Sequence, residues 1–212
     1  ISAKVQLVHQ LILQAMKGDM DNDIIDLTPS YSSILVMFDI LTTDHHKVRN
    51  KLRVLLNSLN ESSIVQGATD GSSTVELPVY YGVESGPDLA AIAKRTKLSI
   101  EQIINIHQSI EYRVYAIGFA PGFAYCGEVN EKIVTPRLDT PRAKVLKGSV
   151  AIANNQTAVY PSESPGGWNI LGRTTVEMFD KKTNNLCPVN VGDKIQFFTI
   201  NKEKFLNEGG VI

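Results

Sequence analysis

Residues 115–179 are the feature that most restricts how this chain can fold, because turn-forming residues are concentrated there far more than on either side. The segment contains the run Gly118-Phe119-Ala120-Pro121-Gly122-Phe123, two Pro-Arg pairs, and Tyr160-Pro161 followed by Pro165-Gly166-Gly167-Trp168. Glycine and proline interrupt helices and mark turns. A segment so rich in turns predicts loops, and loops commonly carry functional sites.

Short β-branched or aromatic runs, separated by Gly, Pro or Asn, fill the chain after His107. They predict strands at 112–117, 145–153, 158–160, 169–171, 174–179 and 195–200. Many short strands with dense turn signals favour a closed or nearly closed barrel. Spacing alone does not distinguish this barrel from a sandwich.

Two helices are predicted before these strands. The run Gly86-Pro87-Asp88 introduces a helix through about Thr96. Ser99, followed by Gln102 near the capping-box position, predicts a capped helix over 100–106.

The N-terminal part has the pattern of a small α/β domain. Apolar residues at helical spacing predict a helix over 2–17, and β-rich runs at 24–27 and 33–38 follow it. Asp44 is placed to cap a second helix, whose apolar stripe extends from Val48 to Leu59.

One strand before Ile1, together with the strand-like run 74–80, would complete the β-α-β-β-α-β pattern of ferredoxin-like domains. We therefore expect residues upstream of Ile1 to pair with the 33–38 region. We predict an α+β chain with a ferredoxin-like α/β domain over residues 1–70 and a β-barrel domain over 71–212. Gly, Ser, Thr and Asp cluster like a linker from Gly67 to Ser73. The pattern leaves open whether the run 74–80 belongs to the domain before this linker or to the domain after it.

Charge and composition exclude several classes of function. With 21 basic and 22 acidic residues, the net charge of −1 gives no field that would gather nucleic acid or an anionic membrane. The longest apolar run, Ile34 to Phe38, is far shorter than the roughly 20 residues of a membrane-spanning helix. Cys126 and Cys187 lie far apart without Cys-x-x-Cys spacing, which favours reduced thiols in a cytoplasmic protein.

Several catalytic motifs are missing, and the histidines are ambiguous. The chain has no Gly-x-x-x-x-Gly-Lys phosphate loop, no Gly-x-Ser-x-Gly and no His-Glu-x-x-His. His45 and His46 are adjacent at a predicted helix start, where their side chains diverge, so we expect a solvated face rather than a metal site. His107 ends a predicted helix, where it would serve either as a general acid or base or as a C-terminal cap.

Three arginines, Arg137, Arg142 and Arg173, lie beside rigid or glycine-rich turns. A guanidinium held in this way binds carboxylate or phosphate in a bidentate manner. The alternative is that these side chains tie loops together through backbone carbonyls or face water.

Aromatic and polar residues of the same segment are further candidates. Trp168, Phe119 and Phe123 stand on glycine turns and would either plug a barrel end or form a binding wall. Tyr160 and Gln156 supply a hydroxyl and an amide that suit the orientation of a small polar amide or lactam.

Three successive segments, GFAPGFAYCG, PRLDTPRAKVLKGSVAIA and NQTAVYPSESPGGWNILGRT, carry a resemblance to a known family. The chain resembles the B subunits of bacterial 5-oxoprolinase, a family also known as the kinase inhibitor KipI and as allophanate hydrolase subunit 1. The resemblance implies a cyclophilin-like fold for the barrel. It extends weakly to GPDLAAIA, His107 and the 31–36 run, and thus covers nearly the whole chain.

The chain departs from this family at one turn. The family usually has glycine where Asn154 and Ala158 stand. Because alanine tolerates left-handed backbone less well than asparagine, we expect this turn to differ slightly.

The function implied by the resemblance is that of an enzyme subunit. It is the B component of an ATP-dependent 5-oxoprolinase, which acts with A-type and C-type subunits to open the lactam of 5-oxoproline to glutamate. Since this chain has no phosphate loop, ATP is expected to be bound by, or shared with, the partner subunits, and no metal site is readable. The rivals are a KipI-like inhibitor of a sensor histidine kinase and a urea carboxylase-type carboxyltransferase subunit.

We assign the candidate residues three roles. They are catalysis for His107 and Arg142, substrate binding for Arg137, Gln156, Tyr160, Trp168 and Arg173, and a partner interface for Phe119 and Phe123. The three arginines, His107 and Tyr160 are expected to converge on one concave surface of the barrel, because their loops bracket the densest cluster of turns.

Overall fold

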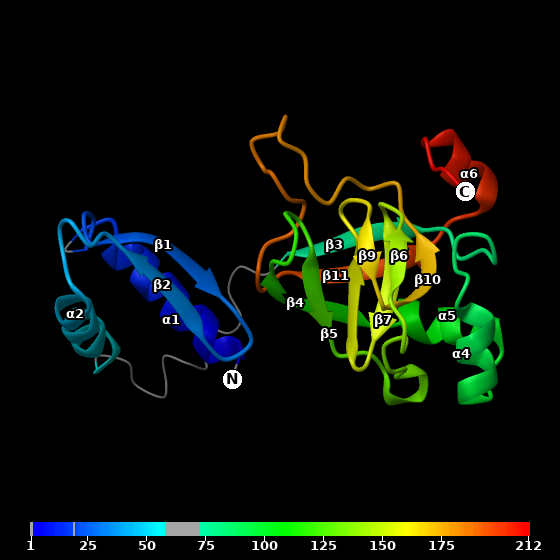
Figure 1. Ribbon diagram of the computed structural model, residues 1–212, viewed down its shortest axis with the longest axis horizontal. Helices are drawn as coiled ribbons and strands as arrows, with labels where there is room; N and C mark the ends of the chain where they lie inside the picture. Colours follow the sequence, from blue (N-terminus) through cyan, green and yellow to red (C-terminus); the bar gives the residue numbers. More distant parts are fainter. Residues whose placement is uncertain (1, 19, 58–72) are drawn as a thin grey trace. The chain divides into compact units, whose positions relative to one another are not determined.

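The computed structural model describes residues 2–18, 20–57 and 73–212 and separates the chain into two units, Ile1–Ser72 and Ser73–Ile212 (Figure 1). The predicted helical position Leu59 and residues 67–72 of the predicted linker lie outside the described residues. Each unit has its own buried apolar clusters.

The first unit contains two helices and a hairpin, in the predicted order. Its elements are α1 (Ser2–Ala15), β1 (Ile24–Pro29), β2 (Ile34–Phe38) and α2 (His45–Asn57). The Lys47 backbone N–H donates to Asp44 Oδ1 at 2.9 Å, which confirms Asp44 as the cap of α2. Ile12 of α1 packs with Ile24 and Leu27 of β1 in a small buried cluster.

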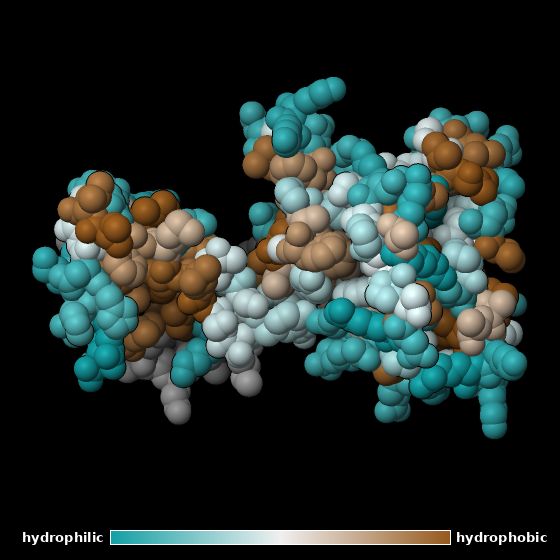
Figure 2. Space-filling model, in the orientation of Figure 1, coloured by the Kyte–Doolittle hydropathy of each residue, from teal (hydrophilic) through white to brown (hydrophobic). Residues whose placement is uncertain are grey.

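The sheet of the first unit has two antiparallel strands among the described residues, with Leu27 opposite Val36. This hairpin exposes the apolar side chains Ile25, Leu35 and Met37, and Figure 2 shows apolar surface over β1 and β2. The next strand, β3 (Thr74–Val79), pairs in parallel with a strand of the second unit and does not join this sheet. The full ferredoxin-like arrangement therefore stays a prediction.

The second unit is built on a seven-stranded mixed sheet in the order β10-β7-β8-β5-β4-β11-β3. Besides β3, the sheet contains β4 (Glu111–Ile117), β5 (Ala124–Gly127), β7 (Ser149–Ala153), β8 (Gln156–Val159), β10 (Asn169–Arg173) and β11 (Lys194–Thr199). Tyr80, directly after β3, exchanges two backbone hydrogen bonds with Arg173 at the end of β10, at 2.8 and 3.0 Å. These bonds join the two edge strands, so the sheet is a nearly closed barrel.

The remaining elements lie around this barrel. They are α4 (Leu89–Thr96), α5 (Ile100–Gln108), the 3-10 helix η1 (Glu131–Ile133), a two-stranded ribbon of β6 (Arg142–Val145) and β9 (Ser164–Gly166), and α6 (Lys202–Asn207). Ser99 and Gln102 form the predicted capping box at the start of α5. Leu89 and Ile92 of α4 and Ile103 of α5 pack into the barrel core.

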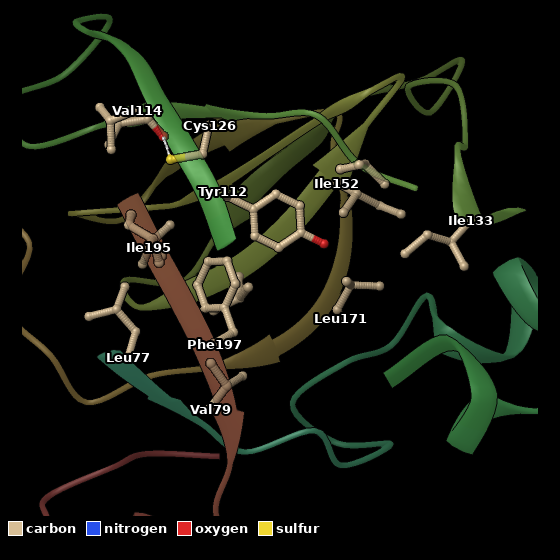
Figure 3. Packing of buried hydrophobic residues seen from close by; sticks show 14 of the residues in the cluster. Leu77, Val79, Tyr112, Val114, Cys126, Ile133, Ile152, Leu171, Ile195 and Phe197 are labelled. Carbon is tan, nitrogen blue, oxygen red and sulfur yellow. Dashed lines mark hydrogen bonds between the residues drawn. The ribbon is translucent and has the colours of Figure 1, made fainter. Parts of the chain in front are cut away.

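Strands β7 and β8 are buried on both faces, and the candidate site lies against one of these faces. Successive side chains of a strand point to opposite faces. Val150 and Ile152 thus join the main core, whose packing around Tyr112 and Phe197 is seen in Figure 3. Their neighbours Ala151 and Ala153 join a second cluster on the other face, together with Ala158 of β8 and Tyr160, which directly follows that strand.

Several strand predictions were wrong. Residues 174–179 form no strand, because the chain leaves the sheet after the closing pair at Arg173. Met178 of this segment is still buried in the core, which explains its apolar pattern. Strands β5, β6 and β9 were missed because they are short and contain the glycine, proline or charged residues that read as turns.

Candidate functional site

The second cluster gathers most of the aromatic candidates around Phe123. Its ring centroid lies 5.3 Å from Phe119, 4.8 Å from Tyr125, 5.3 Å from Tyr160 and 5.7 Å from Trp168. The contacts with Tyr160 and Trp168 are edge-to-face, an arrangement that aromatic quadrupoles favour. We call these five residues, Phe119, Phe123, Tyr125, Tyr160 and Trp168, the aromatic face.

The loop before β5 determines which of the two phenylalanines is accessible. Gly118 N–H donates to the Phe123 carbonyl, and Phe123 N–H donates to the Ala120 carbonyl, both at 3.0 Å. This tight turn leaves Phe119 70% exposed and Phe123 2% exposed. Phe123 is thus a core residue of the aromatic face, which contradicts its predicted place at a partner interface.

Phe119 also has an unusual backbone conformation, with φ at 73°. Positive φ is a strained conformation for a bulky residue and costs about 1–3 kcal/mol. An exposed aromatic ring held on strained backbone contributes little to the stability of the fold. It is therefore a candidate contact for another molecule.

Arg137 borders the aromatic face, with its guanidinium carbon 5.7 Å from the centroid of the Trp168 ring. Both neighbours of Arg137 are fixed by hydrogen bonds. Asn169 Nδ2 donates to the Pro136 carbonyl at 2.8 Å, and Leu138 N–H donates to the Gly167 carbonyl at 2.8 Å. The arginine is therefore exposed but supported by a clamped backbone.

Arg142 is already engaged within the fold. Its Nη2 lies 2.6 Å from Asp88 Oδ1, while Asp88 Oδ2 accepts the Ile170 backbone N–H at 2.7 Å. Arg142 Nη1 also approaches the Trp168 carbonyl at 3.5 Å. With Asp88 only 8% exposed, this ion pair joins the start of α4 to β6 and β10. The geometry favours a positioning role for Arg142 over the predicted catalytic one.

Tyr160 lies between the two arginines and the Gly-Gly turn. Burial raises the pKa of Tyr160, while a backbone hydrogen bond with Trp168 and the charges of Arg137 and Arg142 oppose that shift. A Cβ on Gly166 would lie 2.3 Å from the Tyr160 hydroxyl oxygen, so glycine is required where the ribbon crosses this ring.

His107 does not reach this surface. It is fully buried in the barrel, stacked on Phe197 at 4.8 Å, with Nδ1 2.8 Å from the Tyr81 hydroxyl and Nε2 3.0 Å from Thr157 Oγ1. Because Thr157 Oγ1 donates to the Ala151 carbonyl, it accepts from Nε2–H, and Nδ1 accepts from Tyr81. Burial lowers the pKa of His107 to about 3. The histidine is a neutral core residue, which argues against its predicted catalytic role.

Arg173 and Gln156 are also separated from Tyr160. The Arg173 guanidinium donates to the backbone carbonyls of Lys147, at 2.8 Å, and Val211, which matches the loop-tying alternative. Gln156 begins β8, four residues before Tyr160, or roughly 13 Å along an extended strand. The predicted convergence on one surface is therefore wrong for His107 and Arg173, whereas Arg137, Arg142, Tyr160 and Trp168 are brought together.

Sequence reasoning missed Asp88 and Tyr125. Tyr125 alternates with Phe123 in the segment leading into β5, so period-two spacing was a usable signal. Asp88 lies 54 residues before Arg142, and no local pattern connects them.

Metal ligands and membrane-spanning helices are both absent from the parts of the chain that the structure describes. Residues 2–18, 20–57 and 73–212 contain no group of three His, Cys, Asp or Glu side chains placed to hold a metal ion. Across the same ranges, no helix has the length and apolar character needed to cross a membrane. Cys126 is buried and Cys187 is partly exposed, and both are free thiols.

Residues 1–189 match the protein family described as carboxyltransferase domain, subdomain C and D. Two curated relatives are named as the B subunit of 5-oxoprolinase. The protein of Bacillus subtilis (strain 168) is 35% identical over 186 residues, which are 85% of this chain and 78% of that protein. The protein of Haemophilus influenzae is 36% identical over 195 residues, which are 92% and 88% of the two chains.

Solved structures are similar over nearly the whole chain. TTHA0988 superposes with a TM-score of 0.78 at 30% identity, over 94% of this chain and 37% of that one. This chain thus spans little more than a third of the length of TTHA0988. The urea amidolyase of Kluyveromyces lactis superposes with a TM-score of 0.67 at 16% identity, over 95% of this chain and 14% of that protein, which is a likeness of fold alone.

Proposed function

Because the chain belongs to the carboxyltransferase domain, subdomain C and D, family and to the group of 5-oxoprolinase B subunits within it, we propose that it is one subunit of an ATP-dependent 5-oxoprolinase. The complex would open 5-oxoproline to glutamate with A-type and C-type subunits. In this proposal the first unit has a ferredoxin-like fold and the second a cyclophilin-like fold. ATP is bound by, or shared with, the partner subunits.

The observation that carries this proposal is the aromatic face, with Arg137 beside it. It combines an exposed guanidinium on a clamped backbone with an exposed Phe119 ring held on strained backbone. Such a surface is half of a site, since it offers a polar anchor and an apolar contact but no nucleophile or general base among the residues assigned to it. A partner subunit completes it, and the interface includes Phe119.

The first test is reconstitution. The purified chain is assayed for ATP-dependent glutamate release from 5-oxoproline, alone and mixed with A-type and C-type subunits. We expect no turnover alone and turnover in the full mixture. Full turnover by this chain alone would exclude the shared site. No turnover in any mixture, together with tight inhibition of a sensor histidine kinase, would favour the kinase-inhibitor function instead.

The second test separates the partner contact from folding. Phe119→Asn places a residue that tolerates positive φ at this position, so relief of the backbone offsets the lost ring contact and stability changes little. We expect partner affinity, measured by titration calorimetry, to fall by about tenfold or more, as for a buried interface aromatic. The matched control is Val83→Asn, another exposed apolar loop residue, which should leave affinity unchanged. Equal effects of the two substitutions would remove Phe119 from the interface.

A further inference from the structure

Arg137 is the cation beside the Trp168 ring, and it has no ion-pair partner among the described residues. Arg142 is paired with Asp88 at 2.6 Å, and Lys144 on the neighbouring ribbon is paired with Glu163 at 2.8 Å. No ion pair joins Arg137 to a carboxylate within the described ranges. Of these three cations, Arg137 is thus the one that makes no ion pair within the described residues.

The backbone that carries Arg137 is also fixed. The backbone on either side of it is fixed to residues 167–169, and the same residues carry the Trp168 ring over which the guanidinium lies. An indole beside a guanidinium removes water from one face and leaves the N–H edges free to bind. Because this backbone is already ordered, less conformational freedom is lost when a ligand arrives, which favours binding.

A single exposed guanidinium on an ordered backbone matches a monoanionic planar group. Its parallel N–H bonds fit the two oxygens of a carboxylate. A phosphate, with its higher charge, is usually bound by more than one cation or by a phosphate loop, and the chain has no such loop. The chemistry of this surface therefore points to a carboxylate.

We propose that Arg137, supported by the Trp168 ring, binds the carboxylate of a small organic acid, which in the proposed reaction is the carboxylate of 5-oxoproline or of the glutamate formed from it. The identity of the acid rests on the proposed function, whereas carboxylate binding does not. The apolar edge of the ligand would then lie beside Phe119, the exposed ring of the aromatic face. This assignment makes Arg137 a specificity-determining residue, which selects substrates that bear a carboxylate.

The test uses Trp168, which is the only tryptophan of the chain and so reports directly on this surface. The full chain is titrated with 5-oxoproline, with 2-pyrrolidinone, which has the same lactam ring without the carboxylate, and with inorganic phosphate. We expect a saturable fluorescence change with 5-oxoproline and at least about tenfold weaker responses to the other two probes.

Substitutions identify the group that binds. Arg137→Met should weaken 5-oxoproline binding by about tenfold or more, and Arg137→Lys should recover only part of it because an ammonium does not bind bidentately. Lys144→Met is the matched control, because it removes an exposed cation that is already paired, and it should bind as the parent chain does. Far-UV circular dichroism and the thermal midpoint confirm that each variant is folded.

The reconstituted complex supplies the decisive comparison. There, Arg137→Met should raise KM for 5-oxoproline by about tenfold or more with a smaller effect on kcat. The inference is overturned if KM is unchanged and the isolated chain binds the lactam without a carboxylate, or phosphate, as tightly as 5-oxoproline. Arg137-dependent carboxylate binding without turnover in any mixture would retain this site and reject the oxoprolinase function. Turnover that survives Arg137→Met with an unchanged KM would reject this carboxylate site and retain the oxoprolinase function.

Discussion

Asp88 is a buried carboxylate that holds three parts of the second unit together. One oxygen pairs with Arg142 of β6 and the other accepts the backbone N–H of Ile170 in β10. Although it precedes α4, its side chain makes no capping hydrogen bond. Its position is therefore explained by the ion pair beneath Trp168 rather than by the helix.

Asp88→Asn should destabilise the chain by about 1.5–3 kcal/mol, because the charge-assisted bond is lost while the Arg142 guanidinium stays partly buried. The measurement is urea unfolding followed by Trp168 fluorescence. Glu163→Gln breaks the exposed pair with Lys144 and is the control, with an expected change of about 0–1 kcal/mol. Equal losses in the two variants would show that the buried pair has no special role.

His107 gives the chain a dependence of stability on pH whose sign follows from its pKa. Burial lowers that pKa to about 3, below the ordinary value of 6.5, so the unfolded chain binds more protons between these values. Stability from this group is fully present above about pH 6.5 and falls as the pH is lowered towards 3.

Comparison of the parent chain with His107→Gln tests this. Between pH 7 and pH 5 the parent should lose up to about 2 kcal/mol more unfolding free energy than the variant, which has no imidazole to protonate. Unfolding in urea at the two pH values measures the difference. If both chains lose the same stability, His107 is accessible to protons in the folded state.

At the scale of elements, the sequence predicted the features that depend on residues close together in the chain. The Ser99 capping box and the Asp44 cap were readable because each depends on residues within one helical turn. Asn154 was expected to tolerate left-handed backbone, and its φ is 53°. Ala158, by contrast, lies inside β8 and needs no such conformation, so alanine is compatible with the backbone there.

Features that depend on contacts between residues far apart in the chain could not be predicted from the sequence. The β6–β9 ribbon is defined by pairs such as Arg142 with Gly166, and no spacing in the sequence encodes them. His107 shows the same limit, because its neutral state is set by Phe197 and Thr157 from strands far along the chain. In the candidate site, the turn before Phe123 was predicted correctly, whereas the turn-like residues of β6 and β9 form a ribbon. Which side chains are exposed or buried there depends on the packing of Phe123 and Asp88.

At the scale of the whole molecule, the buried clusters divide between the two units. The first unit packs around Ile12, Ile24 and Leu27, whereas the second packs around residues such as Ile152 and Phe197. Trp168 belongs to the second unit, so its fluorescence reports on that unit, while far-UV circular dichroism also follows the two helices of the first.

We therefore expect two unfolding transitions that substitutions shift separately. Ile152→Ala should lower the stability of the transition seen by Trp168 by about 2–5 kcal/mol, because it leaves a cavity in the barrel core. Ile12→Ala should lower the other transition, seen by circular dichroism, and leave the Trp168 signal in place. Since each substitution removes the same side-chain atoms from a fully buried site, the pair is matched. A single transition that both substitutions shift equally would show that the chain folds as one cooperative unit, in which case the two cores are not independent sources of stability.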